Sequence, residues 1–359
     1  MKNKLKVIQI IDSLNPGGAE MMAVNIANGL AKNGIKSFLC ATRIEGDLKT
    51  KINDEVGYLF LNKKSSLGIN TFIKLSKFIK RNQIAIIHAH SSSYFIASII
   101  KVMNPSVKLV WHNHYGNSEN LPILNKILLI GISNIFNSTI SVNLKLKEWA
   151  ISTLKSKNNY YLPNFASLNA KIKETTFLKK NNNTRILCLA NFRPEKDHIN
   201  LLKAFIKVQK THSDWTLHLI GLDLMNNYSD SIKSFIIKHQ LTNTVFLYGA
   251  CQDIAFILEQ ATIGILASKS EGLPVALLEY GLAKLSVVVT NVGDCANVVT
   301  NEINGLIVPP NNDVLLGEAI LKLINKPKLS KTLGEELFNT VTSKFSKEKY
   351  ISKLIKIYH

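Results

Sequence analysis

Hydrophobic and polar positions follow two alternating patterns along the whole chain. Short apolar runs rich in valine and isoleucine recur, and they are separated by longer segments in which apolar residues return every three or four positions. The short runs are typical of strands covered on both faces, and the longer segments are typical of crossover helices. The chain is therefore predicted to be an α/β protein built on parallel sheets.

Five predicted strands lie in the first half of the chain and five in the second. The first five are Lys6–Ile11, Ser37–Ala41, Ala85–His88, Lys108–Trp111 and Ser138–Val142. The second five are Arg185–Leu189, Thr216–Ile220, Val245–Tyr248, Ile263–Leu266 and Ser286–Val289. Helices are predicted between the strands of the second half, and in the first half near Ala19–Lys32, Asn70–Arg81, Tyr94–Met103 and Leu121–Phe136.

A polar stretch rich in lysine and asparagine separates the two series of strands, after Pro163 and Asn164. We therefore predict one doubly wound, Rossmann-like domain over residues 1–164 and a second over residues 165–345, with residues 346–359 forming a helix that returns to the first domain. Ligands bind such sheets outside the carboxyl ends of the strands. Two units of this kind are expected to face each other across a cleft.

The composition is that of an ordered globular protein, because 46% of the residues are hydrophobic and 19% are charged. The four cysteines lie far apart and form no CxxC pair, which argues against a zinc site or a disulfide framework. The amino-terminal apolar run is too short for a signal peptide, and no apolar stretch is long enough to span a membrane. The expectation is a soluble, cytoplasmic protein.

The positive charge is concentrated in the first half of the chain. Residues 1–164 contain 21 Lys and Arg against 8 Asp and Glu, a net charge of +13, out of +19 for the whole chain. Such a face is compatible with a solvated surface, with anionic lipid headgroups on the inner face of the plasma membrane, or with nucleic acid. No nucleic-acid-binding motif accompanies it, so a nucleic-acid partner is not expected.

Three short segments carry residues suited to an anionic, hydroxyl-rich ligand. Gly17 and Gly18 lie at a strand-to-helix turn, where backbone N–H groups can approach an anion, although an ordinary tight turn has the same sequence. Arg193 and Lys196 follow the first strand of the second half and suit phosphate oxygens; a solvated loop is the alternative. The Gly17-Gly18 turn matches neither the GxGxxG fingerprint of dinucleotide-binding proteins nor the phosphate loop of nucleoside triphosphatases.

The third segment follows a later strand of the second half. Pro274 suits the first position of a helix, which would put Glu271 and Gly272 in the loop at the positive end of that helix. Glu279 would then lie within the helix. Two carboxylates so placed can accept hydrogen bonds from hydroxyls at two ends of an extended ligand.

Taken in chain order, these segments resemble the landmarks of the family 4 retaining glycosyltransferases, which have the two-domain GT-B fold. The matching residues are Gly17-Gly18-Ala19-Glu20, Pro163-Asn164, Pro194-Glu195-Lys196 and Glu271-Gly272-x-Pro274-x4-Glu279. The last element is the most specific. The likeness extends over nearly the whole chain.

The resemblance implies a role for each matching residue. His112, Lys196 and Glu271 would be catalytic: His112 would line the active site beside the sugar, Lys196 would stabilise the leaving diphosphate, and Glu271 would contact the sugar hydroxyls. Donor-binding residues would be Gly17, Gly18, Asn191, Arg193, Lys196, Glu271, Gly272, Leu273, Pro274 and Glu279, the last of which would hold the ribose hydroxyls. His114 and Glu20 are candidates for the acceptor side.

One residue departs from the family pattern. Asn191 lies five residues before the loop lysine, Lys196, where family members often have an arginine. The positive charge of that arginine, a phosphate ligand, is therefore missing unless Arg193 supplies it from a different direction. No Asp-x-Asp motif occurs in a suitable position, and neither a metal nor a cofactor is expected.

The function implied is transfer of a sugar, with retention, from a nucleotide-sugar donor to a glycan or lipid-linked glycan acceptor in surface polysaccharide biosynthesis. UDP is the first choice of nucleotide. Two alternatives remain open: a catalytically inactive glycosyltransferase-like partner subunit, and a GT-B nucleotide-sugar epimerase. The sequence leaves the oligomeric state undecided.

Overall fold

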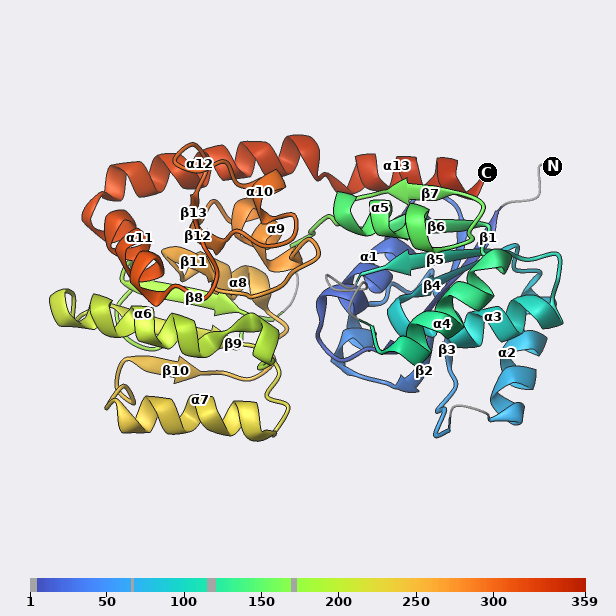
Figure 1. Cartoon of the computed structure of the whole chain (residues 1–359), viewed down its shortest axis with the longest axis horizontal. Helices are drawn as coiled ribbons and strands as arrows, with labels where there is room; N and C mark the ends of the chain where they lie inside the picture. The colour runs from blue at the N-terminus through green and yellow to red at the C-terminus, as the bar shows by residue number, and fades with distance from the viewer. Residues whose placement is uncertain (1–4, 66–67, 115–120, 169–172) are drawn as a thin grey trace. The chain divides into compact units, whose positions relative to one another are not determined.

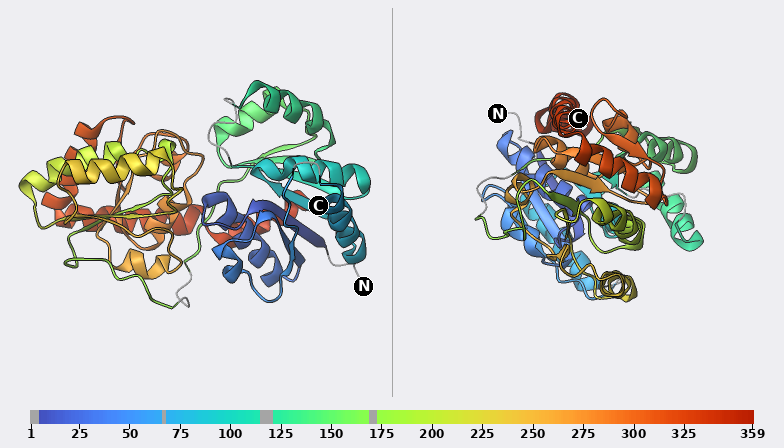
Figure 2. Two further views of the ribbon diagram at one scale, coloured as in Figure 1. Left: turned by 90° about the horizontal axis from the view of Figure 1, so that it is seen from below. Right: turned by 90° about the vertical axis from the view of Figure 1, so that its left-hand side faces the viewer.

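A computed structural model describes residues 5–65, 68–114, 121–168 and 173–359 of the chain. It divides into two compact units, one formed by Met1–Asn164 together with Lys347–His359 and the other by Phe165–Ser346. Each unit is a parallel sheet with helices packed against it (Figures 1 and 2). The predicted fold class, two Rossmann-like α/β domains, is confirmed.

The first unit has a seven-stranded sheet in the order β3-β2-β1-β4-β5-β6-β7, and every paired strand runs parallel to its neighbour. Its strands are β1 (Lys6–Ser13), β2 (Lys36–Ile44), β3 (Gly57–Phe60), β4 (Ile86–His90), β5 (Lys108–Asn113), β6 (Ser138–Ser141) and β7 (Asn159–Tyr161). Its helices are α1 (Gly18–Lys32), α2 (Ile69–Asn82), α3 (Tyr94–Met103), α4 (Ile123–Ile132), α5 (Leu144–Thr153) and α13 (Lys347–Tyr358).

The near-continuous apolar strands of this sheet are explained by cores on both of its faces. Along β2, Phe38 and Cys40 belong to one buried cluster, whereas Leu39 and Ala41 belong to another. Successive side chains of a strand point to opposite faces, so both faces of this strand are covered by apolar side chains.

Helix α13 packs on the first unit although it lies at the far end of the chain. The Tyr358 hydroxyl lies 2.7 Å from Nδ1 of His88, and Lys108 donates to the Tyr358 carbonyl oxygen at 3.1 Å. Gly29 of α1 faces Ile351 so closely that a Cβ there would lie 2.7 Å from the isoleucine Cδ1. The last helix therefore contacts strands β4 and β5 and helix α1.

The second unit has a six-stranded parallel sheet in the order β10-β9-β8-β11-β12-β13. Its strands are β8 (Arg185–Leu189), β9 (Thr216–Ile220), β10 (Val245–Leu247), β11 (Ile263–Leu266), β12 (Ser286–Thr290) and β13 (Leu306–Val308). Its helices are α6 (His198–Thr211), α7 (Asn227–Lys238), α8 (Ile254–Glu259), α9 (Val275–Leu282), α10 (Cys295–Val298), α11 (Asp313–Asn325) and α12 (Pro327–Lys344).

Three strands were missing from the sequence prediction, namely β3, β7 and β13. All three are edge strands of three or four residues. An edge strand is covered less completely than a central one and needs no long apolar run, so its sequence signal is weak.

Helix α5 was also missed. The helix predicted near Leu121–Phe136 is shorter, because α4 ends at Ile132 and a 3₁₀ turn, Ser133–Ile135, follows.

Gly264 of β11 provides a test of the packing in the second unit. A Cβ added to Gly264 would lie 2.7 Å from the Tyr280 ring on α9, so we expect Gly264→Ala to destabilise the protein by about 1–3 kcal/mol. Urea unfolding followed by circular dichroism measures this loss.

Gly131→Ala is the matched control, because Gly131 is exposed on α4 and a Cβ there meets nothing within 4 Å. It should leave stability unchanged or raise it slightly, since alanine favours helix. Equal unfolding free energies for Gly264→Ala and wild type would contradict the packing described.

Candidate functional site

The carboxyl ends of β8 and β11 bring two of the predicted segments together. These strands are parallel neighbours, pairing Ile186 with Ile263, and the chain continues from β8 to β9 on the other side. The winding direction of the sheet therefore reverses between β8 and β11, the position where ligands bind open α/β sheets. The loop after β8 contains Lys196, and the loop after β11 contains Glu271.

An ion pair joins these two loops. The Lys196 Nζ lies 2.7 Å from Oε1 and 2.9 Å from Oε2 of Glu271. Ser268 donates its hydroxyl to the same Oε1 at 2.6 Å. The Glu271 side chain is only 7% exposed and that of Lys196 24%. A carboxylate buried this far requires such partners, so the three side chains form one polar cluster.

Further contacts hold the two loops in register. Lys269 donates its backbone N–H to the Glu195 carbonyl at 2.8 Å, and its ammonium lies 3.3 Å from Asp197. On the other side, Gly293 has φ +54° and lies against the carbonyl oxygens of Glu271 and Gly272, where a Cβ would collide. A residue with a side chain would push the Glu271 backbone away.

Helix α9 starts beside this cluster. Pro274 is its N-cap residue and Val275 its first residue, so the prediction that Pro274 occupies the first helical position was wrong by one residue. No side chain caps this end, and Gly272, Leu273 and Pro274 are buried just before it. Backbone N–H groups in the first turn of a helix and the helix dipole make such an end suitable for an anion. Glu279 is half-buried within the helix.

Tyr280 holds α9 against the two central strands. Its ring packs on Gly264 of β11, and its hydroxyl accepts a hydrogen bond from the Leu189 N–H at the end of β8, at 2.7 Å. The helix start, the Glu271 loop and the end of β8 are thereby positioned by one side chain.

Asn191, the departure from the family pattern, has a structural contact. Its Oδ1 accepts a hydrogen bond from the Leu222 N–H at 2.8 Å, which ties the loop after β8 to the segment after β9. Arg193 is exposed and precedes the 3₁₀ turn Pro194–Lys196 that contains the lysine. Arg193 is therefore exposed to solvent, three residues before Lys196.

The glycine turn of the first unit is present as well. Gly17 precedes α1 and Gly18 is the first residue of that helix. The Glu20 carboxylate lies directly against Gly17, so closely that a Cβ on Gly17 would collide with it. The Glu20 side chain, in the first turn of α1, therefore folds back onto the N-cap residue Gly17.

His112 and His114 belong to a group of four histidines in the first unit. His112 is at the end of β5 and fully buried, and His114 follows it and is partly exposed. Burial holds the pKa of the His112 imidazole well below its usual value, and lowers that of His114 to about 3. Both rings are therefore neutral near pH 7.

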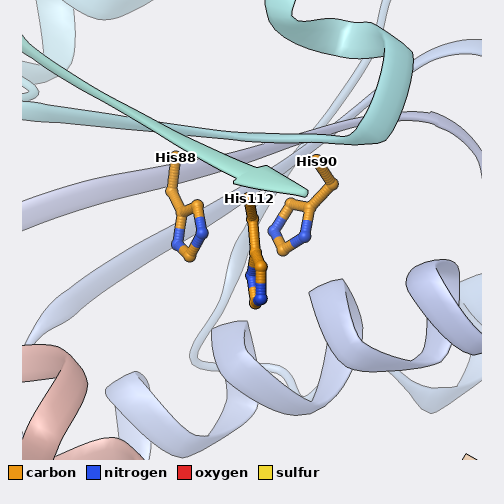
Figure 3. Close-up of side chains that lie close together, drawn as sticks. All are labelled: His88, His90 and His112. Carbon is orange, nitrogen blue, oxygen red and sulfur yellow. The ribbon is translucent and has the colours of Figure 1, made fainter. Parts of the chain in front are cut away.

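The structure adds His88 and His90 on β4, which sequence reasoning missed (Figure 3). His90 pairs with His112 across the strands, and its Nδ1 lies 2.9 Å from Nε2 of His114. The spacing of two residues between His88 and His90 could have indicated a shared face. Their alignment with His112 depends on which strands are neighbours, and that required the fold.

Each unit has its own set of polar groups at the carboxyl ends of its central strands. In the second unit, a lysine, a buried carboxylate and an uncapped helix start can bind an anion next to hydroxyl groups. The first unit has a glycine turn and neutral imidazoles. In the part of the chain that the structure describes, no helix is both long and apolar enough to cross a membrane.

Two family models match the chain in succession. The model described as "Glycosyltransferase Family 4" matches residues 16–166, and the model described as "Glycosyl transferases group 1" matches residues 170–339. The first range contains the glycine turn and the histidines. The second contains Lys196, Glu271 and Glu279.

Two curated relatives align with most of this chain at low identity. An uncharacterized glycosyltransferase of Haemophilus influenzae is 24% identical, covering 87% of this chain and 88% of the relative. A second relative, from Escherichia coli, is 23% identical, and the alignment covers 87% of this chain and 86% of the relative. It is named UDP-Gal:alpha-D-GlcNAc-diphosphoundecaprenol alpha-1,3-galactosyltransferase.

Solved structures confirm the fold over the whole chain. HepE of Anabaena, crystallised with UDP and glucose, superposes with a TM-score of 0.82 at 17% identity and 98% coverage of both chains. TarM of S. aureus superposes with a TM-score of 0.80 at 13% identity, covering 99% of this chain and 100% of TarM. Since the two family models together match nearly all of the chain in the order of its two domains, the chain belongs to the family 4 glycosyltransferases, of GT-B fold.

Proposed function

We propose that this chain is a retaining glycosyltransferase that moves a sugar from a nucleotide-diphosphate donor to a lipid-linked glycan acceptor during surface polysaccharide biosynthesis. The observation that carries the proposal is the cluster of Lys196, Glu271 and Ser268 at the point where the second sheet reverses its winding. Such a cluster suits a ligand with both phosphate and hydroxyl groups.

Lys196 is the proposed diphosphate ligand. An ammonium has three N–H donors, and the two oxygens of Glu271 take up two of these directions. The third direction is available for a phosphate oxygen. A fixed positive charge at that place stabilises the negative charge that builds up on the leaving nucleoside diphosphate, and because Lys196 is already held by Glu271 it needs little reorganisation.

Glu271 and Glu279 are the proposed hydroxyl ligands. Glu271 would accept hydrogen bonds from the transferred sugar, and Glu279, inside α9, from the ribose of the nucleotide. The N–H groups at the start of α9, after Gly272, Leu273 and Pro274, would bind phosphate oxygens between the two. Gly17 and Gly18 would approach the same donor through their backbone, and Arg193 would add a second cation.

His112, His114 and Glu20 are the proposed groups on the acceptor side in the first unit. His112 and His114 are held neutral by burial, so they can donate to or accept from sugar hydroxyls without adding charge. For the chemical step we propose the same-face route that the family resemblance implies, in which the departing phosphate takes the proton of the acceptor hydroxyl.

Asn191, the departure from the family pattern, does not by itself favour the alternative of an inactive partner subunit. Its side chain closes a hydrogen bond to Leu222 that an arginine in its place would have to make differently. The departure from the family pattern therefore has a structural use, while Lys196, Glu271 and Glu279 all remain in place.

Relatives support the choice of donor and acceptor. HepE was crystallised with UDP-glucose, and the Escherichia coli relative is named for UDP-galactose and a diphosphoundecaprenol acceptor. Another relative is a capsular polysaccharide biosynthesis glycosyltransferase of Staphylococcus aureus, 25% identical over 64% of this chain. We propose a UDP-sugar donor and an acceptor anchored in the inner face of the plasma membrane.

Helix α4 supports contact with that membrane. Four large apolar side chains are exposed on it: Ile123 at 68%, Leu124 at 77%, Ile127 at 59% and Leu128 at 42%. The residues up to Asn164, which include α4, carry a net charge of +13. An exposed apolar helix face on a basic unit fits an anionic lipid surface, where insertion and charge attraction add together. We propose that α4 touches the headgroup region while the enzyme acts.

The role of Lys196 is tested by Lys196→Met, which keeps the length of the side chain and removes its charge. We expect kcat for sugar transfer from UDP-sugars to fall by about 10²–10³-fold, since one preorganised electrostatic contact to the transition state is lost. Lys207→Met is the control, because the ammonium of Lys207 forms a partly exposed ion pair with Asp313. Equal rates for the Lys196 variant and wild type would remove Lys196 from the mechanism.

The donor nucleotide is tested by thermal unfolding in the presence of UDP-, GDP-, ADP- and CMP-sugars. A ligand that binds only the native state raises the melting temperature, and we expect this for UDP-sugars alone. Glu279→Ala should abolish the rise, and Glu259→Ala, an exposed carboxylate at the end of α8, should retain it. Stabilisation by another nucleotide class would correct the donor; stabilisation by none would favour the inactive subunit.

Membrane contact is tested by sedimentation with vesicles. Wild type should bind vesicles containing phosphatidylglycerol and bind pure phosphatidylcholine weakly. Replacing Leu124 and Ile127 together by glutamate should lower the bound fraction roughly tenfold, because apolar insertion is lost. Ile237→Glu, at an equally exposed position on α7, is the control. Binding unaffected by the α4 variant would place the contact elsewhere or exclude it.

A further inference from the structure

One lysine of the first unit is buried, and no contact satisfies its charge. Lys63 follows β3, is 6% exposed, and donates its backbone N–H to the Thr42 carbonyl of β2 at 2.7 Å. Among the described residues, none forms a hydrogen bond or an ion pair with the Lys63 ammonium. Lysine is almost never buried to this extent unless it is paired, so the position calls for an anionic partner that binds there.

The charges around Lys63 do not compensate its own. Burial lowers the pKa of its ammonium, the positive charge of Arg43 lowers it further, and the negative charge of Asp12 opposes this. The Asp12 carboxylate is already occupied, because the hydroxyls of Thr42 and Ser92 donate to its two oxygens, at 2.5 and 2.6 Å. The Arg43 Nε lies 4.0 Å from Oδ1 of Asp12. Two cations therefore share one carboxylate that already accepts two hydrogen bonds.

Neighbouring charged groups increase the excess of positive charge. Lys74 of α2 donates to the Phe60 carbonyl at the end of β3, at 2.9 Å. Glu45 lies two residues after Arg43, but its carboxylate forms an ion pair with the Lys49 ammonium at 2.8 Å. The region beyond the ends of β2 and β3 is therefore cationic, which favours the binding of an anion there.

These cations lie at the same edge of the sheet as the groups proposed for the acceptor side. Arg43 is the last residue but one of β2, and Lys63 lies three residues beyond β3. Because the strands are parallel, the ends of β2, β3, β4 and β5 share one edge. In the strand order β3-β2-β1-β4-β5, the cations lie on one side of β1, and His112 and His114 lie on the other. The glycine turn follows β1, between them.

We propose that Lys63 and Arg43 bind the diphosphate of the acceptor, which is then a sugar joined through a diphosphate to a lipid. This inference rests on the proposed function and specifies its acceptor. A guanidinium and an ammonium are both suited to phosphate oxygens. A diphosphate that links a sugar to a lipid carries two negative charges, which match the two cations, whereas the phosphodiester of a headgroup such as phosphatidylglycerol carries one.

The strand order also gives the bound acceptor a direction. β2 and β4 lie on either side of β1, so their ends are about 10 Å apart at the usual spacing of strands. A diphosphate with one or two sugar rings can span this distance. With its diphosphate at Lys63 and Arg43, the acceptor would direct its sugar hydroxyls toward His112 and His114, whose neutral rings are the proposed hydroxyl partners.

The first experiment measures the binding of inorganic pyrophosphate by thermal unfolding of the full-length protein. Every variant also carries Lys196→Met, because Lys196 is the proposed phosphate ligand of the second unit. Pyrophosphate should raise the melting temperature of this parent protein. Lys63→Met should increase the pyrophosphate concentration needed for the same rise by about 10–100-fold, and Lys64→Met, at an exposed neighbour, should not. No rise in the parent, or equal curves for the parent and the Lys63 variant, would overturn the site.

The same measurement separates a binding role from a structural one. Lys63→Met removes a buried charge without a partner, so the melting temperature without ligand should stay the same or rise. A lower melting temperature together with unchanged pyrophosphate binding would make Lys63 a structural residue and overturn the site. If Lys63→Met does not fold, Arg43→Met decides, because the Arg43 side chain is 39% exposed. Pyrophosphate binding that is unchanged in Arg43→Met would then overturn the site.

The second experiment identifies the ligand by steady-state kinetics with a polyprenyl diphosphate-linked sugar as acceptor, in protein that retains Lys196. Lys63→Met and Arg43→Met should raise the KM for this acceptor by about 10–100-fold and leave the KM for the UDP-sugar unchanged. Sedimentation with phosphatidylglycerol vesicles should also be unchanged. Lost vesicle binding would assign the site to a lipid headgroup, and a raised donor KM would assign it to the donor; either result overturns the proposed ligand. An unchanged acceptor KM with normal sugar transfer would overturn it as well and leave the proposed function intact.

Discussion

The parallel pairing of β8 with β11 is the contact on which the arrangement of the donor site depends. Each strand ends in a loop, and because parallel neighbours end at the same edge, the loops containing Lys196 and Glu271 meet although 75 residues separate them. The reversal of winding at this position leaves no crossover helix above the two strand ends. The Lys196–Glu271 ion pair, the Ser268 hydroxyl and the start of α9 are all consequences of that one neighbour relation.

The first unit has the same organisation around β1 and β4. Asp12 at the end of β1 accepts hydrogen bonds from Thr42 of β2, at 2.5 Å, and from Ser92, which follows β4, at 2.6 Å. His88 and His90 lie on β4, and His112 lies on β5. Both sheets therefore gather polar side chains at the carboxyl ends of their central strands.

Polar groups buried in these sheets are costly unless they have partners, and the two units meet that cost in different ways. Glu271 is satisfied by a lysine and a serine from its own unit. The imidazoles of the first unit are only partly satisfied by Gln9, Tyr358 and each other. The cluster around Glu271 is therefore complete, whereas ring nitrogens of His88, His112 and His114 have no partner among the described residues.

Periodicity and turn residues determined the fold class, because apolar runs and helical spacing are local properties that survive in a single sequence. The grouping of Lys196, Glu271 and Glu279 came instead from the resemblance to a known family, whose short motifs have fixed spacing, and their shared role in donor binding stays a prediction. The edge strands β3, β7 and β13 were beyond that reasoning, because short, partly covered strands have little apolar signal. The tertiary structure alone decided which loops meet, that Asn191 bonds to Leu222, and that His88 and His90 join His112, because strand order and register bring together residues whose separation in sequence carries no trace of their contact.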